Sequence, residues 1–143
     1  MQHVILTMAL LFSTIILGQN STNLNIEKTN SITVSIVNAL NDDGTANFAL
    51  FDKENFRKQP LQAKTSKIEN GKSTVIFENV RNGQYAIICF HDENENKKMD
   101  FELNGMPKEN YGTSNNSLSF GPPQFENSKF ELLNEDVVLE IKF

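Results

Sequence analysis

The chain has 143 residues and a net charge of −5, with 38% hydrophobic and 22% charged residues. This length fits one domain with one core, and this composition is typical of a globular protein. No cluster of Lys and Arg is longer than two residues, which argues against a nucleic-acid partner and against docking on anionic lipid. The single cysteine, Cys89, excludes an intramolecular disulfide and is expected to be a buried core residue.

Residues 1–19 have the features of a secretory signal peptide. The apolar run Val4–Leu17 is shorter than the roughly 20 residues that span a bilayer and has the length of a signal-peptide core. Cleavage is expected near Gln19, followed by a polar leader over 20–30 and a domain over 31–143. The expected location is therefore secreted or periplasmic, with no membrane span after cleavage; an uncleaved anchor is the alternative.

The first half of the domain shows strand patterns. Ile32, Val34 and Ile36 alternate with polar residues, which predicts a half-buried strand. The turn Asn41–Gly44 and the apolar segment Ala46–Phe51 then predict a second strand that forms a hairpin with the first. The polar stretch 52–67 is expected to be a connection.

Further strands are predicted after the Asn70-Gly71 turn, over Ser73–Phe77 and Gln84–Phe90, and at the end of the chain, over Phe130–Leu133 and Val137–Phe143. The segment from Phe77 to Tyr85 resembles a hairpin common in transthyretin-like and other immunoglobulin-like sandwiches, in which Gly83 is expected at positive φ and Tyr85 packs over the corner. The fold class predicted is all-β, an immunoglobulin-like or transthyretin-like β-sandwich of six to seven strands with a long irregular loop.

An acidic loop follows the strand that ends at Phe90. Oxygen-bearing residues recur at alternate positions, which suits a calcium loop because Ca²⁺ takes six to eight hard oxygen ligands. The candidate metal ligands are the side chains of Asp92, Asn94, Asn96 and Asp100 and the main-chain carbonyl of Lys98. Lys97 stands where an EF-hand has Gly, and Leu103 where it has a bidentate Glu, so Glu102 or water would complete the shell. A solvated acidic turn is the alternative interpretation.

The long segment 104–127 is expected to be irregular. Tyr111, Asn115 and Asn116 combine an aromatic ring with amides, the chemistry of carbohydrate or peptide recognition, and are a candidate ligand-binding loop. The alternative is that Tyr111, Phe120 and Phe125 anchor this segment against the sandwich.

Several motifs in chain order resemble the domain-of-unknown-function family 2141. They include Phe90–Asn94, Gly105–Glu109, Tyr111–Asn116 and Gly121–Phe125. The resemblance covers about Ile32–Phe143 and implies a secreted or envelope-associated bacterial protein, with no established activity and no catalytic residues to assign. Members often have Gly where this chain has Lys97 or Lys98.

Two hypotheses of function result. The first is an exported non-enzymatic binding or structural module of the bacterial envelope, stabilised by calcium, with a carbohydrate or protein ligand. The alternative is a metal-assisted hydrolase centred on His91 and Asp92, for which no Ser-x-Gly elbow or HExxH motif is present.

Overall fold

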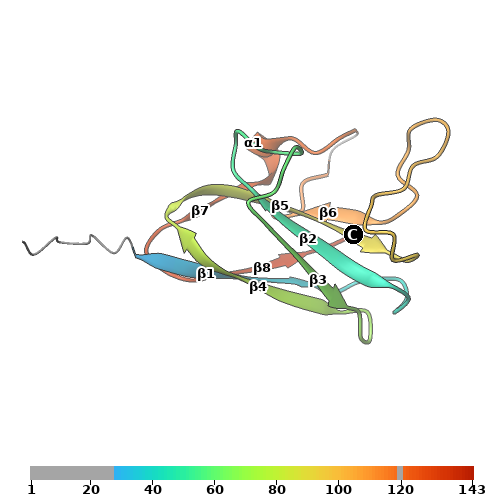
Figure 1. Cartoon of the computed structure of the whole chain (residues 1–143), viewed down its shortest axis with the longest axis horizontal. Helices are drawn as coiled ribbons and strands as arrows, with labels where there is room; N and C mark the ends of the chain where they lie inside the picture. Colours follow the sequence, from blue (N-terminus) through green and yellow to red (C-terminus); the bar gives the residue numbers. More distant parts are fainter. Residues whose placement is uncertain (1–27, 119–120) are drawn as a thin grey trace, which may run out of the picture.

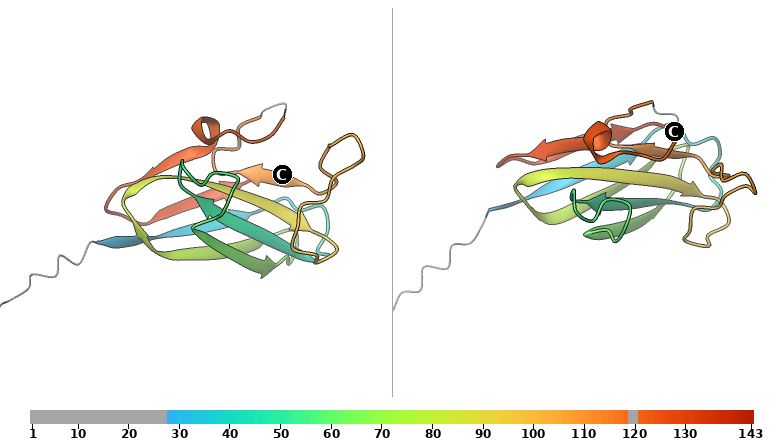
Figure 2. Two further views of the ribbon diagram at one scale, coloured as in Figure 1. Left: turned by 45° about the horizontal axis from the view of Figure 1, so that its top comes forward. Right: turned by 90° about the horizontal axis from the view of Figure 1, so that it is seen from above.

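Eight β-strands and one short helix make up the described part of the computed structural model, which comprises residues 28–118 and 121–143. The predicted signal peptide and most of the polar leader lie outside these residues. The strands form two sheets that face each other as layers (Figure 1; Figure 2). The fold class predicted from the sequence is therefore confirmed, with one strand more than expected.

The smaller sheet has three strands in the order β4-β1-β8. β1 (Thr29–Ile36) runs antiparallel to β4 (Ser73–Arg81) and parallel to β8 (Val137–Ile141).

The larger sheet has five strands. Its order is β3-β2-β5-β6, and β7 pairs with the same edge of β5 as β6 does. The bounds of these strands are β2 (Thr45–Phe51), β3 (Gln62–Lys67), β5 (Gly83–Asp92), β6 (Tyr111–Thr113) and β7 (Lys129–Leu132).

Alternate residues of the facing strands form the core between the sheets. β1 contributes three fully buried aliphatic side chains, and β2, β4 and β5 contribute large ones; the principal members are Ile32, Val34, Ile36, Phe48, Leu50, Phe77 and Ile87. Cys89 is fully buried in this cluster, as expected, and burial raises the pKa of its thiol. A thiol held in its neutral form is a poor nucleophile.

Both hairpins predicted in the first half of the domain are wrong. β1 and β2 belong to different sheets, and so do β4 and β5, so the chain crosses the core at each connection. Gly83 does not have a positive φ; the left-handed residue near this corner is Asn79, with φ 58°. Alternation of apolar and polar residues identifies a strand, but two successive strands show the same alternation whether they pair in one sheet or face each other across the sandwich. The sequence pattern therefore could not exclude a hairpin.

Three short or polar elements were not predicted. β3 lies inside the stretch expected to be a connection, because it is an edge strand with mostly exposed side chains. β6 has three residues and the helix α1 (Phe125–Ser128) has four, and both lie in the segment expected to be irregular. Phe125 of α1 contacts Phe56 edge-on, with ring centroids 5.6 Å apart, so this segment packs on the outer face of the larger sheet. Within the described ranges no helix is long and apolar enough to cross a membrane.

Candidate functional site

The acidic loop begins where β5 ends, next to a buried histidine. His91 is fully buried, and its Nε2–H donates to the carbonyl of Asp43 at 2.6 Å. Its ring stacks on Phe143 with centroids 6.4 Å apart. Nδ1 makes no hydrogen bond within the described part of the chain and lies 3.9 Å from Oε1 of Glu93. His91 is thus fixed between the sheets by packing and by a main-chain bond.

Asp92 is the first candidate ligand, and its carboxylate is completely buried. Oδ2 accepts hydrogen bonds from the Asn47 amide at 3.0 Å and from the Lys97 main-chain N–H at 2.8 Å, while Oδ1 accepts one from the Asn96 N–H at 3.1 Å. All three donors are neutral amides. A buried carboxylate bonded only by neutral groups keeps strong attraction for a cation, because the low dielectric around it does not screen its charge.

Gly44 allows the loop to pack this closely. It has φ +65°, and a Cβ at this position would lie 2.0 Å from the carbonyl oxygen of Asp92. No residue with a side chain fits there, so the turn at Asn41–Gly44 and the base of the acidic loop are fitted to each other.

Asn94 and Asn96 form two consecutive Asx turns that shape the loop. Asn94 Oδ1 accepts a bond from the Asn96 N–H at 3.0 Å, and Asn96 Oδ1 accepts one from the Lys98 N–H at 2.8 Å. Their Nδ2 groups both donate to Oδ2 of Asp100, at 2.6 and 2.9 Å. Hydrogen bonds therefore connect all four candidate side chains, Asp92, Asn94, Asn96 and Asp100, within one loop.

The backbone of the loop takes the conformation that a calcium loop requires at its sixth position. Lys97 has φ +63°, which is the left-handed region that glycine adopts most easily. The lysine at this position therefore does not prevent the turn, although it costs about 1–2 kcal/mol relative to a residue with no Cβ. The absence of Gly at this position is therefore a weaker argument against a calcium loop than the sequence suggested.

Glu109 is the residue of this site that the sequence analysis missed. Residues 100–108, which we call the arm, fold back on themselves: the Lys108 N–H donates to the Asp100 carbonyl at 2.9 Å, and Phe101 and Pro107 form a β-bridge. This return places Glu109 Oε2 3.1 Å from the main-chain nitrogen of Asp100, which donates to it. The turn residues Asn104-Gly105 were the signal in the sequence for such a return.

Glu109 lies in the electric field of two other carboxylates. Burial raises the pKa of Glu109, and the charges of Asp92 and Asp100 raise it further, against the lowering effect of the bond from the Asp100 N–H. Oε1 of Glu109 is buried and has no partner at normal hydrogen-bond distance among the described residues, although the main-chain N–H of Glu93 also lowers the pKa of this carboxyl. Glu102, the residue expected to complete the shell, is instead exposed on the arm.

The acidic groups alone do not form a metal centre. Across the residues described, 28–118 and 121–143, no three His, Cys, Asp or Glu side chains are grouped so as to hold a metal ion. Any cation here would need the Asn94 and Asn96 amide oxygens and main-chain carbonyls as well, which are ligands that calcium accepts. In the structure the Nδ2 groups of both asparagines, and not their oxygens, face Oδ2 of Asp100.

The candidate ligand-binding loop is largely engaged in main-chain contacts. The Asn115 amide donates to the carbonyls of Asn127 and Lys129, at 3.3 and 2.7 Å. The Asn116 amide donates to the Glu140 carbonyl and accepts from the Lys142 N–H, at 2.8 and 2.7 Å. Tyr111 begins β6, opposite Phe90. These contacts tie the loop to β7 and β8, and ligand binding by the loop stays a prediction.

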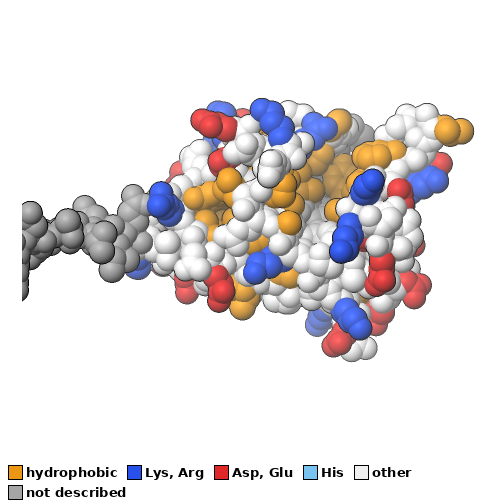
Figure 3. Space-filling view, in the orientation of Figure 1, with side chains coloured by type: hydrophobic (Ala, Val, Ile, Leu, Met, Phe, Trp, Pro, Cys, Tyr) orange, Lys and Arg blue, Asp and Glu red, His pale blue; other side chains and the backbone are white. Residues whose placement is uncertain are grey.

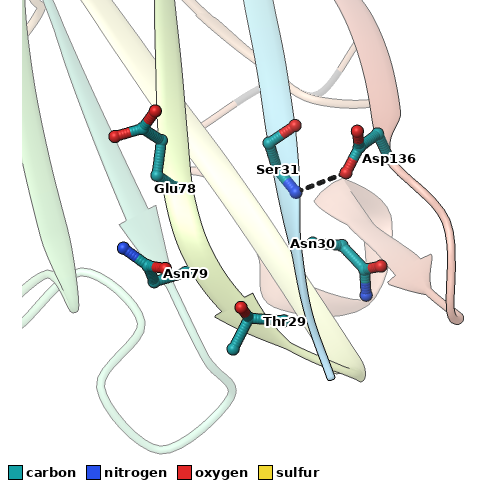
Figure 4. A pocket seen from close by; sticks show the side chains of 6 residues that line it. All are labelled: Thr29, Asn30, Ser31, Glu78, Asn79 and Asp136. Carbon is teal, nitrogen blue, oxygen red and sulfur yellow. Dashed lines mark hydrogen bonds between the residues drawn. The ribbon is translucent and has the colours of Figure 1, made fainter. Parts of the chain in front are cut away.

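A shallow hollow of about 350 Å³ lies at the other end of the sandwich, beside the start of β1 (Figure 4). The Ser31 N–H donates to Oδ1 of Asp136 at 2.7 Å, and this bond lowers the pKa of Asp136. Every lining residue is polar, whereas ligand pockets are mostly apolar: Thr29, Asn30, Ser31, Glu78, Asn79 and Asp136. The hollow therefore lacks the character of a small-molecule site.

The fold and the loop together define a two-layer β-sandwich domain with an acidic loop at one end. Residues 34–140 match the model of a family described as "Uncharacterized protein conserved in bacteria (DUF2141)". The chain therefore belongs to this family, as the sequence resemblance predicted. No curated protein matches the sequence.

One solved structure is similar to the chain, a pilus-presented adhesin, Spy0125 (Cpa). The sequence identity is 12% and the TM-score 0.29, and the match covers 82% of this chain and 27% of the adhesin chain. The chain thus spans about a quarter of the adhesin's length. Similarity at this level supports no conclusion about the fold or the function of this chain.

Proposed function

We propose that this protein is an exported binding or structural module of the bacterial envelope, that it is not an enzyme, and that the loop Asp92–Asp100 binds calcium. The observation that carries the proposal is the grouping of Asp92, Asn94, Asn96 and Asp100 by hydrogen bonds within one loop, with the Glu109 carboxylate held against the main chain of Asp100. Carboxylate and amide oxygens are the ligands that calcium takes.

Calcium suits this loop better than other common cations. The donors are carboxylate, amide and main-chain oxygens, which are hard ligands, and the loop is irregular rather than octahedral. Zinc and copper prefer His and Cys, and here His91 is held by packing while Cys89 lies in the core. Glu109 supplies the carboxylate that the twelfth position of the loop, Leu103, lacks.

The alternative, a hydrolase centred on His91 and Asp92, loses support. A general base must reach a substrate proton, but His91 is completely buried and its Nε2–H is bonded to main chain. Asp92 is buried as well, with both oxygens accepting hydrogen bonds from the loop. His91 fixes the end of β5, and Asp92 faces the loop as a candidate calcium ligand.

Thermal unfolding in EDTA and in several millimolar calcium tests the metal site. With few charged ligands, affinity should be weak, on the order of 10⁻⁴–10⁻³ M. Several millimolar calcium is then a roughly 5- to 50-fold excess over the dissociation constant, and binding to the native state alone stabilises it by about 1–2 kcal/mol, so the melting temperature should rise by several degrees. Magnesium should do much less, because it keeps its waters and demands octahedral geometry.

Three variants localise the effect. Asp92→Asn, Asp100→Asn and Glu109→Gln keep the side-chain shapes and remove one charge each, and each should reduce or abolish the calcium shift. Asp136→Asn is the matched control, because Asp136 bonds Ser31 at the opposite end, and it should leave the shift intact. Equal melting temperatures of the unsubstituted protein in both buffers would refute the calcium site and leave a solvated acidic turn.

A further inference from the structure

We infer that the arm, residues 100–108, docks on the outer face of the larger sheet in a second copy of this chain. This self-association goes beyond the function proposed above and requires no bound metal. The first observation behind it is the exposure of three large apolar side chains on the arm: Phe101 is 58% exposed, Leu103 110% and Met106 61%. Exposed apolar side chains gathered on one element mark an interaction site.

The arm is an ordered element that holds these side chains away from the core of its own copy. The Glu102 N–H donates to the Met106 carbonyl at 2.7 Å, and the β-bridge between Phe101 and Pro107 closes the arm further in. Gly105, with φ +83°, makes the reversal. Figure 1 shows the arm standing off the end of the sandwich, and Figure 3 shows hydrophobic side chains at its outer end. The fold itself therefore presents the apolar end of the arm to the surroundings.

An apolar surface that fits this end lies on the outer face of the larger sheet. Ile87 and Cys89 of β5 are fully buried between the sheets, so Ile88 and Phe90 point to the opposite side, where both are half-buried. Ala49 of β2 is paired with Ile88 and is half-buried too. Figure 3 shows hydrophobic side chains set back on this side of the molecule, next to the arm. A recessed apolar face accepts a narrow, projecting apolar end.

The charges of the two surfaces are complementary. Residues 92–109, the acidic loop and the arm, contain six acidic residues and three lysines, a net charge of −3. Residues 52–67, which we call the basic segment, contain five basic and two acidic residues, a net charge of +3. Opposite charges attract across an interface, whereas two arms repel each other. The charges therefore favour an arm placed against the basic segment of a partner over contact between two arms.

The positions of the arm and the basic segment allow a reciprocal contact. Figure 2 shows the arm at one end of the larger sheet and the loop 52–61 on the outer face, away from that end. When two copies face each other across a two-fold axis, each arm lies over the basic segment of the other, which is the closed arrangement of most soluble dimers. Contacts through one arm on each copy are smaller than the roughly 800 Å² per partner of a standard stable interface, so the dimer is weak and reversible.

Sedimentation equilibrium over concentrations from about 10 μM to about 1 mM, the range of weak association, tests the inference. The protein is used as cells export it, and all variants are compared in the same form. The mass should rise from monomer to dimer with concentration, equally in EDTA and in calcium. The triple variant Phe101→Ser, Leu103→Ser, Met106→Ser should dimerise at least about tenfold more weakly. Leu133→Ser is the matched control, since Leu133 is exposed but follows β7 at the opposite end (Figure 1), and it should dimerise normally.

Charge substitutions test which surface receives the arm. Lys58→Glu with Lys67→Glu reverses the net charge of the basic segment and should weaken dimerisation. Adding Glu95→Lys and Glu102→Lys to the same chain reverses the charge of the loop and the arm as well. This fourfold variant should dimerise again, because its two surfaces are once more opposite in charge. All four side chains are exposed, so the substitutions leave the core intact.

A protein that stays monomeric over the whole range would overturn the inference, and so would a dimer that persists in the triple variant. Dimerisation that is unchanged or strengthened by Lys58→Glu with Lys67→Glu would show that the arm does not bind the basic segment, and would overturn it too. Dimerisation in calcium but not in EDTA would contradict an association that needs no metal. None of these results decides the calcium site, which thermal unfolding tests separately.

Discussion

Tyr85 and Gly83, near the start of β5, constrain each other. The Tyr85 hydroxyl donates to the Arg81 carbonyl at 3.0 Å, so the ring folds back over the corner between β4 and β5. A Cβ on Gly83 would lie 3.2 Å from the Tyr85 hydroxyl and 3.3 Å from its ring. Tyr85 lies at this corner as expected from its sequence motif, but Gly83 provides space for the ring and does not have the positive φ that was expected.

Substitutions at this corner should lower the free energy of unfolding in a coupled way. Tyr85→Ala should cost about 3–5 kcal/mol, because it empties the space of a buried ring, and Tyr85→Phe about 1 kcal/mol, for the hydrogen bond alone. Gly83→Ala should also destabilise, by crowding the ring. In a double-mutant cycle measured by urea unfolding, Gly83→Ala should cost clearly less when residue 85 is already Ala; an equal cost in both backgrounds would show that backbone conformation, not the ring, requires Gly83.

At the scale of elements, ion pairs of Glu126 join the helix α1 to two neighbouring segments of the chain. Glu126 in α1 forms ion pairs with Lys53, at 2.9 Å, and with Lys129. The hydrogen bonds and charges of Lys129 and Lys53 lower the pKa of Glu126 to about 2. These contacts connect α1 with the loop after β2 and with the start of β7.

The lowered pKa predicts the direction of a pH effect. Because the folded-state pKa of Glu126 is below its unfolded value, any stability it supplies is present above the ordinary Glu range, near pH 4.5, and is lost as the pH falls toward 2. The effect should be small and should shrink with added salt, since the groups are exposed. Carbon-detected NMR titration should place the Glu126 pKa well below the ordinary Glu value of 4.5; an ordinary pKa would mean that the ion pairs do not persist in solution.

The elements show which parts of the fold a sequence can predict. Six strands could be recognised in the sequence by alternation or by apolar runs, because each buries one face against the core. β3 did not, because an edge strand with exposed side chains has no such pattern. The sequence also did not show which strands pair with β1 and β4. Whether two successive strands pair in one sheet or lie in opposite sheets depends on which faces pack together, and not on the turn residues alone.

The candidate site divides in the same way. Asp92, Asn94, Asn96 and Asp100 are close in the chain, so their spacing was enough to group them, and the structure connects them by hydrogen bonds. Glu109 joins them only because the arm returns through the bridge of Phe101 and Pro107. A residue that reaches a site only because the chain turns back has no characteristic spacing from the other site residues, so it cannot be recognised in the sequence even when the turn itself is evident.

For the molecule as a whole, the sandwich draws its core from residue 32 onward. Ile32 is the first member of the buried cluster, and β1 begins at Thr29, two residues before the domain start expected from the sequence.

The corresponding prediction concerns the exported protein. Expression of the full chain in a bacterium should yield protein in the periplasm or the medium whose N-terminus lies near Asn20, because the apolar run Val4–Leu17 has signal-peptide length and a small, polar exit at Gly18 and Gln19. Interrupting the run with Leu11→Arg should retain the chain in the cytoplasm, since a charge in the apolar core blocks insertion, whereas Ser21→Arg, beyond the cleavage point, should not. The processed chain should melt cooperatively as a single unit. Mass spectrometry of the exported protein decides the matter: an intact Met1 would mean that the segment is retained, and the apolar run would then be an anchor that holds the sandwich at the membrane.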